Sequence, residues 1–201
     1  MFQDLWTVPN AITLVRLACL PLFLYLLFGR ENRAAAAFLL GGLGATDWVD
    51  GYVARRFHQV SEFGKIFDPT VDRLLFIVGI TAILADGAMP RWFGIAVLTR
   101  EVLVGAMMLV ATFVFGMARI DVTWWGKTAT FLLMFAVPGF LLGNSDFPGA
   151  DWFLAVSWIL GIPGLVISWW TGLAYIPQVR RGVAAGRTAE SAPSASSSRY
   201  G

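Results

Sequence analysis

The sequence predicts an all-α integral membrane protein with six transmembrane helices and a short N-terminal interfacial segment. It is 57% hydrophobic and only 14% charged, whereas a soluble domain carries roughly a quarter charged residues. The apolar residues gather in runs that approach the ~20 residues needed to cross a bilayer. Nine Trp and sixteen Phe residues agree with this fold class, because Trp favours the interfaces of a membrane protein. We therefore expect one membrane domain, not a soluble fold with an anchor.

The six helices are expected, in chain order, at residues 10–29, 34–55, 66–86, 91–117, 126–144 and 151–177. Met1–Pro9 is short and amphipathic, which predicts that it lies along the cytoplasmic interface. Pro9 and Asn10 are typical of a helix start. Residues 182–201 are rich in Gly, Ala and Ser, which predicts a disordered cytoplasmic tail after a membrane domain at residues 1–181.

Basic residues collect in alternate loops of this predicted topology. They are Arg55, Arg56 and Lys65 after the second helix, Arg119 and Lys127 after the fourth, and Arg180 and Arg181 after the last. By the positive-inside rule, these loops and both termini face the cytoplasm. We predict a multi-pass protein of the cell (plasma) membrane. Its basic rim suits anionic membrane lipids, and we expect no nucleic-acid partner.

Four aspartates interrupt the apolar sequence near the predicted cytoplasmic face. Acidic side chains at membrane depth are costly and are therefore candidates for a functional site. A helix turns about 100° per residue. On the second helix one face of about 140° then carries five motif residues, namely Asp47, Asp50, Gly51, Ala54 and Arg55. On the next helix an arc of about 80° carries Gly64, Asp68 and Asp72, so that the two carboxylate pairs can converge.

The chemistry of this carboxylate group predicts divalent metal ions. Four unpaired carboxylates in a low-dielectric pocket would repel one another and partly protonate. A ligand set of oxygen atoms alone favours Mg²⁺ or Mn²⁺, and Mg²⁺ usually completes its shell with substrate phosphates. Gly51 and Ala54 leave room for such a ligand, and Arg55 suits phosphate oxygens. The alternative is that the aspartates are simply ion-paired with nearby basic residues, which are Arg55, Arg56, Lys65 and Arg73.

The motif residues follow the pattern D-x-x-D-G-x-x-A-R-x(8)-G-x-x-x-D-x-x-x-D, complete from Asp47 to Asp72. This pattern resembles the CDP-alcohol phosphatidyltransferase family. Segments 8–16, 99–101 and 126–130 are similar to further parts of the family's bacterial phospholipid synthases. The resemblance implies transfer of a phosphatidyl group from a CDP-linked donor such as CDP-diacylglycerol to an alcohol, with release of CMP. It also implies six transmembrane helices, a homodimer, and two divalent cations, Mg²⁺ or Mn²⁺.

The same resemblance implies roles for individual residues. The metal ligands would be Asp47, Asp50, Asp68 and Asp72, and Asp72 would also be the catalytic base for the acceptor hydroxyl. The residues around the CDP moiety would be Asp47, Gly51, Ala54, Arg55 and Gly64. Asn10 would either contact this donor or simply start the first helix. Two metals would neutralise the pyrophosphate and stabilise the CMP leaving group, and the hydroxyl needs a nearby base.

Two departures from the family pattern bear on the acceptor. Phosphatidylglycerophosphate synthases, which use glycerol 3-phosphate, typically resemble R-E-x(5)-L-R and later G-K-x-K-T. This chain lacks the second arginine after Arg100 and has Ala129 in place of the second lysine. A phosphomonoester dianion should want those charges, whereas phosphatidylglycerol, with one phosphodiester charge, should not. CMP-forming cardiolipin synthases are similar to this chain at both places.

We therefore expect phosphatidylglycerol as the acceptor, with glycerol 3-phosphate as the main alternative and an inositol phosphate as another. Arg100 and Lys127 would contact the acceptor phosphate. Their structural alternatives are a buried Arg100–Glu101 arrangement and a lysine that reaches the interface. Arg16, inside the first helix, needs a partner, which is either substrate phosphate or a motif carboxylate.

Two other classes of membrane protein also use intramembrane acids. An ion-coupled transporter predicts acids near the midplane and internal repeats, whereas here the acids cluster at one face and no repeat is evident. A membrane prenyltransferase predicts more helices and separated aspartate motifs. The single contiguous motif favours the phosphatidyltransferase.

Overall fold

The structure is a computed structural model that describes residues 8–57, 64–113 and 123–190. In these ranges the chain forms helices and their short connections, with no strand. The helices are α1 (Val8–Leu24), continued by the π-helical turn η1 (Tyr25–Gly29), α2 (Arg33–Phe57), α3 (Gly64–Asp86), α4 (Arg91–Phe113), α5 (Trp124–Gly143) and α6 (Ala150–Glu190). The predicted all-α fold with six helices is confirmed. Residues 1–7 of the predicted interfacial segment lie outside the described residues, and its last two residues, Val8 and Pro9, belong to α1.

Four stretches of the described chain are long and apolar enough to cross a membrane. They are Ile12–Gly29, Arg91–Val110, Trp124–Gly143 and Ala150–Pro177. A shorter apolar helix covers Arg33–Thr46, before the motif begins. The protein is therefore an α-helical membrane protein in which the second half of α2 and the first half of α3 carry the polar motif.

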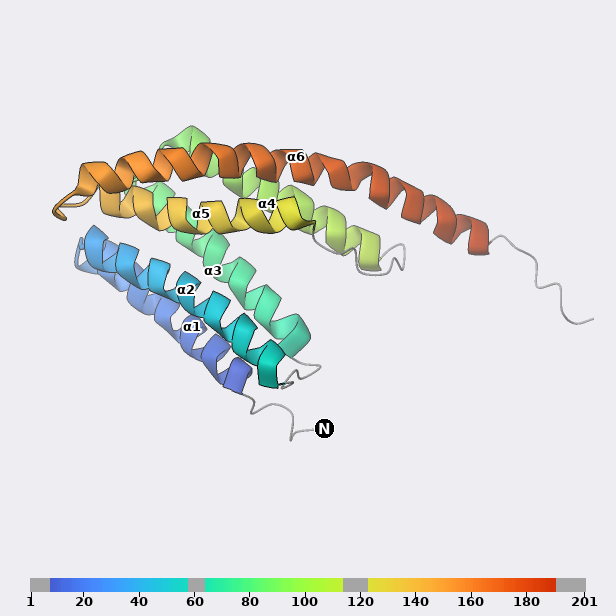
Figure 1. The fold of residues 1–201 in the computed structure, drawn as a ribbon, viewed down its shortest axis with the longest axis horizontal. Coiled ribbons are helices and arrows are strands. Elements are labelled where there is room, and N and C mark those ends of the chain that lie inside the picture. Colours follow the sequence, from blue (N-terminus) through green and yellow to red (C-terminus); the bar gives the residue numbers. More distant parts are fainter. Residues whose placement is uncertain (1–7, 58–63, 114–122, 191–201) are drawn as a thin grey trace, which may run out of the picture.

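The helices pack as a bundle in which α5 and α6 lie side by side along the long axis (Figure 1). Helix α1 packs against both α2 and α3, and α2 also packs against α5. Helix α4 contacts α3 on one side and α6 on the other. This order places α3 between α1 and α4, which matters because α3 carries the end of the motif.

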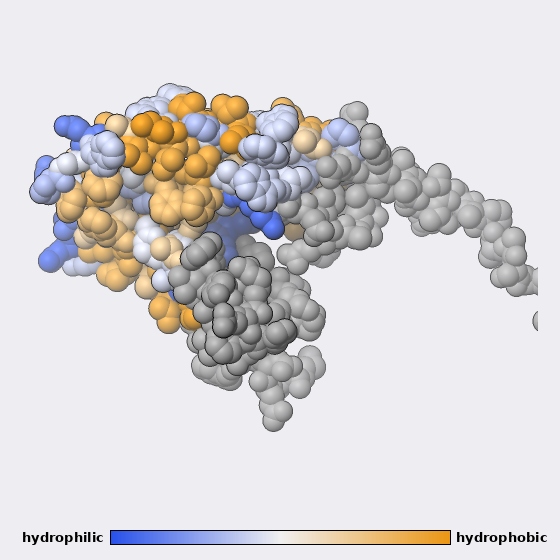
Figure 2. Space-filling model, in the orientation of Figure 1, coloured by the Kyte–Doolittle hydropathy of each residue, from blue (hydrophilic) through white to orange (hydrophobic). Residues whose placement is uncertain are grey.

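The bundle has an apolar interior and an apolar exterior. Phe23, Ile80, Phe93 and Phe140 are completely buried, and the rings of Phe93 and Phe140 lie 5.1 Å apart. On the outside, large apolar side chains cover the body of the molecule (Figure 2). Ile159 is one of these exposed side chains. An apolar surface around the whole bundle is expected where lipid, not water, is the solvent.

Small residues allow α5 and α6 to approach closely. A Cβ atom on Gly143 would lie 2.7 Å from the backbone nitrogen of Leu154, so only glycine fits there. At the other end, the hydroxyl of Thr123 caps α5 by accepting from the backbone of Gly126 at 3.2 Å. The Tyr175 hydroxyl of α6 accepts from the backbone nitrogen of Thr123 at 3.1 Å. Close packing between small residues is a main source of helix association in membranes.

A polar clasp joins three segments at the end of the bundle opposite the motif. We call Arg33, Asp86 and Asn144 the Arg33 clasp. Arg33 Nε donates to Asp86 Oδ2 at 2.8 Å, and Arg33 Nη1 donates to the carbonyl oxygen of Asn144 at 2.9 Å. The Asn144 amide donates to the carbonyl oxygen of Ala88 at 3.0 Å. The start of α2 is thereby tied to the ends of α3 and α5.

Two predicted boundaries differ from the structure. Helix α6 continues to Glu190, so residues 182–190, predicted as part of a disordered tail, are helical. The physical reason is that Val183, Ala184, Ala185 and Arg187 are good or neutral helix residues, and no proline follows Pro177 until Pro193. Residues 191–201 lie outside the described chain. Helix α1 begins at Val8, two residues before the predicted start.

Candidate active site

The motif residues lie on the facing ends of two consecutive helices. Asp47, Asp50, Gly51, Ala54 and Arg55 belong to the second half of α2, and Gly64, Asp68 and Asp72 to the first half of α3. Of these side chains only that of Asp72 is among the described ones. Asn10 belongs to the first turn of α1, and its side chain also lies outside the described part.

Contacts elsewhere on α2 and α3 establish how the two helices are aligned. Arg33 of α2 bonds Asp86 of α3. Seven residues further along each helix, a Cβ atom on Gly79 would lie 3.5 Å from Leu40 Cδ1. The helices are therefore antiparallel. A further seven residues bring positions 47 and 72 to the same level, and seven residues are close to two whole turns. The motif therefore begins and ends at one level of the two antiparallel helices.

Asp72, the last aspartate of the motif, forms an ion pair with Arg16 of α1, through Arg16 Nη1 and Asp72 Oδ1. Arg16 is 5% exposed and Asp72 is 37% exposed. Each lies eight residues from the start of its helix, or about 12 Å along the axis. Of the two partners expected for Arg16 from the sequence, the motif carboxylate is the one observed. The pair holds Asp72 from the α1 side.

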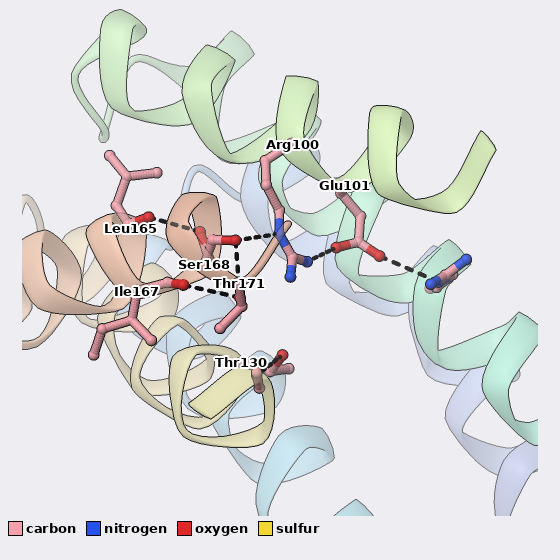
Figure 3. A network of polar contacts seen from close by, with 9 residues as sticks. Arg100, Glu101, Thr130, Leu165, Ile167, Ser168 and Thr171 are labelled. Carbon is pink, nitrogen blue, oxygen red and sulfur yellow. Dashed lines mark hydrogen bonds and ion pairs between the residues drawn. The ribbon is translucent and has the colours of Figure 1, made fainter. Parts of the chain in front are cut away.

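The next residue on α3 reaches the opposite neighbour, α4. Arg73 Nε lies 3.2 Å from Glu101 Oε1, and the other oxygen of Glu101 accepts from Arg100 Nη1 at 2.9 Å. Arg100 Nε donates to the carbonyl oxygen of Ser168 on α6 at 3.1 Å. Figure 3 shows the Arg100 guanidinium between Glu101 and Ser168. We call Arg73, Arg100 and Glu101 the arginine cluster.

The Arg100–Glu101 arrangement, which the sequence offered as the structural alternative to an acceptor-binding role for Arg100, is present, and Arg73 also takes part in it. Arg73 is bound by Glu101, so it does not have the role of partner to the aspartates that the alternative interpretation gave it. The sequence offered one signal for this contact, since charged residues inside apolar helices must find partners. Which partner each one takes depends on how α3, α4 and α6 pack.

The two positions that inform the choice of acceptor can be placed on α5. Gly41 lies against Pro138 and Gly44 against Met134, so α2 and α5 are antiparallel. Seven residues on from Gly44 and seven residues back from Met134, positions 51 and 127 come to one level. Lys127 is exposed. Ala129 is completely buried. Gly164 of α6 lies against Leu133 of α5. Four residues on from Gly164 and four residues back from Leu133, Ser168 and Ala129 lie at one level.

Ala129 therefore lies on the interior side of α5, at the level where Arg100 bonds the α6 backbone. A lysine at this position would begin at the level of the Arg100–Ser168 contact, inside the bundle. The sequence argument concerned a positive charge on the acceptor side, and Ala129, which takes the place of that lysine, lies level with the contact of Arg100.

The fold and these residues define a membrane-embedded enzyme whose polar motif lies at one end of an α-helical bundle. The CDP-alcohol phosphatidyltransferase family model matches residues 6–170. The CMP-forming cardiolipin synthase of Streptomyces coelicolor is 34% identical over 187 residues, covering 87% of this chain and 83% of its own.

Two glycerophosphate-using relatives are also similar, both CDP-diacylglycerol–glycerol-3-phosphate 3-phosphatidyltransferases. The Bacillus subtilis protein is 31% identical over 157 residues, covering 71% of this chain and 80% of its own. The Rickettsia bellii protein is 32% identical over 140 residues, covering 68% and 75%. This chain belongs to the CDP-alcohol phosphatidyltransferase family, as its motif predicted.

Proposed function

We propose that this protein transfers the phosphatidyl group of CDP-diacylglycerol to phosphatidylglycerol, forming cardiolipin and releasing CMP. Family membership supports the reaction, and the similarity to the Streptomyces coelicolor cardiolipin synthase supports this acceptor. The observation that carries the choice is the position of Ala129. Where glycerophosphate-using enzymes typically have a lysine, this chain has a buried methyl group at the level of the Arg100–Ser168 contact.

In the reaction, the acceptor hydroxyl oxygen attacks the phosphorus that bears the diacylglycerol, and the bond from that phosphorus to the CMP phosphate oxygen breaks. The hydroxyl proton goes to a carboxylate, for which Asp72 is the candidate. Arg16 would orient that carboxylate through their ion pair. Gly51, Ala54, Arg55, Gly64 and Asn10 would bind the donor. Arg100 and Lys127 would bind the acceptor phosphate.

The four aspartates would hold two divalent cations, Mg²⁺ or Mn²⁺. The antiparallel alignment of α2 and α3 brings positions 47 and 72 to one level, which fits a shared site. Among the side chains that the structure describes there is no group of three or more metal-ligating residues, and three of the four aspartates lie outside that set. When bound, such ions would neutralise the pyrophosphate and stabilise the CMP leaving group.

Location and assembly follow from the same proposal. The motif ends of α2 and α3 would face the cytoplasm of a cell that carries the protein in its plasma membrane, because the basic loops lie at that end. The protein would act as a homodimer, as its family does.

The second candidate acceptor is glycerol 3-phosphate. It is favoured by the similarity to the Bacillus subtilis and Rickettsia bellii enzymes. An inositol phosphate has no comparable observation in its favour. Family membership leaves no role for the transporter hypothesis.

The test is to give purified protein CDP-diacylglycerol and Mg²⁺ or Mn²⁺, and then each acceptor separately. We expect CMP release and cardiolipin formation with phosphatidylglycerol, and little of either with glycerol 3-phosphate. CMP release with glycerol 3-phosphate alone would overturn the proposed acceptor. Reactions without added cation and with excess chelator are the controls for metal dependence.

A further inference from the structure

Helix α6 anchors both of the basic residues proposed to bind the acceptor phosphate. Arg100, of the arginine cluster, donates from Nε to the carbonyl oxygen of Ser168 at 3.1 Å. Seven residues further along α6, the Tyr175 hydroxyl accepts from the backbone nitrogen of Thr123 at 3.1 Å. Thr123 is the N-cap residue of α5, and its carbonyl oxygen accepts from the backbone nitrogen of Lys127 at 3.1 Å. Two hydrogen bonds through one residue therefore connect Tyr175 to the backbone of Lys127.

We propose that Tyr175 is a positioning residue for the acceptor. Its hydroxyl fixes the first turn of α5, so that Lys127 lies where it can bind the same phosphate as Arg100. This inference rests on the proposed function, because it assumes that Lys127 binds the acceptor phosphate. It does not depend on which of the two candidate acceptors carries that phosphate.

Lys127 and the Arg100–Ser168 contact lie at nearly one level of the bundle. Ala129 of α5 lies level with Ser168 of α6, and Lys127 precedes Ala129 by two residues, which is about 3 Å along the helix axis. Lys127 is also seven residues, or nearly two turns, from Met134, which packs against α2. Its Cα atom therefore lies on the side of α5 that faces α2, the helix on which the motif begins. A phosphate bound by both cations needs such a common level.

The first turn of α5 needs an anchor, because a helix start is weakly constrained. The first four backbone N–H groups of a helix have no partner inside it. In α5 the Thr123 hydroxyl accepts from one of them, that of Gly126, at 3.2 Å, and Tyr175 holds Thr123 itself. Tyr175 is 3% exposed, so little water can take the place of its hydroxyl. Loss of this hydroxyl would leave the Thr123 N–H without its acceptor, which is costly, and would loosen the turn that carries Lys127.

The variant Tyr175→Phe should leave α5 and α6 packed together. It keeps the buried ring and removes only the hydroxyl. The ring centroids of Trp125 on α5 and Trp170 on α6 lie 6.2 Å apart, and this contact also joins the start of α5 to α6. At the other end of the two helices, Gly143 packs against Leu154. The variant therefore tests the position of the first turn, not the stability of the bundle.

The first test compares Tyr175→Phe with the wild type in mixed micelles, in which the mole fraction of each lipid substrate can be varied. We expect the KM for phosphatidylglycerol to rise about fivefold, the equivalent of one ordinary hydrogen bond. The kcat and the KM for CDP-diacylglycerol should stay near their wild-type values, because Tyr175 acts on an acceptor-binding residue and not on the motif.

Two control variants remove a hydroxyl without touching the link from α6 to α5. Tyr25→Phe makes the same chemical change at an exposed tyrosine on the opposite end of the bundle. Thr128→Val removes a bond within α5, from the Thr128 hydroxyl to the carbonyl oxygen of Trp124 at 3.1 Å, one residue away from Lys127. Neither variant should change the KM for phosphatidylglycerol.

A double-mutant cycle shows whether Tyr175 acts through Lys127. Lys127→Gln alone should raise the acceptor KM at least as much as Tyr175→Phe. In the Lys127→Gln protein, Tyr175→Phe should add no further rise, since the side chain that it positions is gone. Hydrogen exchange gives a second measurement that does not depend on activity. The backbone amides of residues 123–127 should exchange faster in Tyr175→Phe and at the wild-type rate in Tyr25→Phe.

The inference is wrong if folded Tyr175→Phe keeps the wild-type acceptor KM, or if the effects of Tyr175→Phe and Lys127→Gln simply add. A lower kcat with unchanged KM values would also contradict it, because that result indicates a structural role alone. If Tyr175→Phe does not fold, Thr123→Pro removes the same hydrogen bond from its other partner. The φ of Thr123 is −62°, which proline adopts, and this variant should raise the acceptor KM in the same way.

Failure of the proposed function gives a different result. If the wild type uses only glycerol 3-phosphate, the proposed acceptor is wrong, and the cycle is measured with glycerol 3-phosphate, whose phosphate Lys127 would bind as well. If Lys127→Gln leaves the KM for the working acceptor unchanged, the proposed role of Lys127 is wrong, and this inference is wrong with it. A higher KM in Lys127→Gln but not in Tyr175→Phe would contradict this inference alone.

Discussion

Arg16 is the residue whose position says most about the catalytic end of the molecule. A buried arginine in an apolar helix is costly unless it is paired, and Arg16 is paired with the carboxylate proposed as the base. Two functional demands meet in this contact. The ion pair balances the positive charge of Arg16 inside α1. It also holds the Asp72 carboxylate at the contact between α1 and α3.

We predict that Arg16→Gln lowers kcat by at least a hundredfold, because Asp72 loses the charge that orients it. A loss of this size corresponds to about 2.7 kcal/mol. Arg16→Lys should recover part of the loss, since the ammonium group restores the charge without the planar geometry of a guanidinium. CMP release would be measured for each variant.

The control for this prediction is Arg30→Gln, an exposed position at the opposite end of the bundle. It should leave kcat unchanged. Size-exclusion profiles in detergent would show that all three variants remain folded. Wild-type activity in a well-folded Arg16→Gln protein would exclude the role assigned to Arg16.

At the scale of helices, α5 and α6 depend on glycine where their backbones meet. Gly143→Ala should destabilise the protein, because the new methyl group would meet the backbone nitrogen and Cα atom of Leu154 at 2.7 and 2.8 Å. Backbone atoms cannot move aside as a flexible side chain can, and overpacking of this kind costs about 1–3 kcal/mol. The melting temperature in detergent is the measurement.

Gly42→Ala is the matched control, also a helical glycine, with no atom within 4 Å of the new methyl group. It should leave the melting temperature unchanged or raise it, because alanine is the better helix former. Equal destabilisation by both variants would show that the α5–α6 contact is not the reason.

The sequence predicts helices much better than it predicts the contacts between them. Apolar runs and the motif located all six helices, because the bilayer sets their length and composition. The end of α6 was missed, since Gly182 and Ser-rich sequence resemble a tail although the intervening residues tolerate a helix. The bond from Arg100 to a carbonyl oxygen of α6 has no sequence signature, because any backbone carbonyl has the same chemistry.

In the candidate site, too, the helix positions follow from the sequence and the side-chain contacts do not. Spacing alone predicts that the motif aspartates lie on facing helix sides, because helical geometry is regular. The partner of Arg16 was narrowed to two possibilities, and the packing of α1 on α3 provides one of them, the carboxylate of Asp72. The Arg73–Glu101 contact was not predicted, because it depends on where α4 lies relative to α3.

For the whole molecule, the distribution of charge predicts orientation in the membrane. The loop at residues 144–149 should face outward, and the C-terminal tail inward. Cys19 is the only cysteine, so a Cys19→Ser background allows single cysteines to report exposure. We predict that a membrane-impermeant maleimide labels Asp146→Cys in intact cells, and labels Ser196→Cys only after lysis. The reverse pattern would place the motif outside the cell.

The two ends of the bundle also have separate tasks, which two Asp→Asn changes should distinguish. Asp68 belongs to the proposed metal site, and Asp86 to the Arg33 clasp at the other end. Asp68→Asn should abolish turnover and reduce the thermal stabilisation that Mn²⁺ gives, while the melting temperature without metal stays near the wild-type value. The reason is the loss of a charged ligand from the proposed metal site.

Asp86→Asn should do the opposite. It weakens the ion pair with Arg33, whose side chain is partly exposed, so about 1 kcal/mol of stability should be lost. The folded protein should keep its kcat and its response to Mn²⁺, because the clasp only aligns α2 with α3 and the Asp86 backbone carbonyl still accepts from Arg33 at 3.3 Å. Substantial turnover by Asp68→Asn would remove the metal-ligand assignment. A large loss of kcat in folded Asp86→Asn would instead mean that the alignment of positions 47 and 72 depends on this one contact.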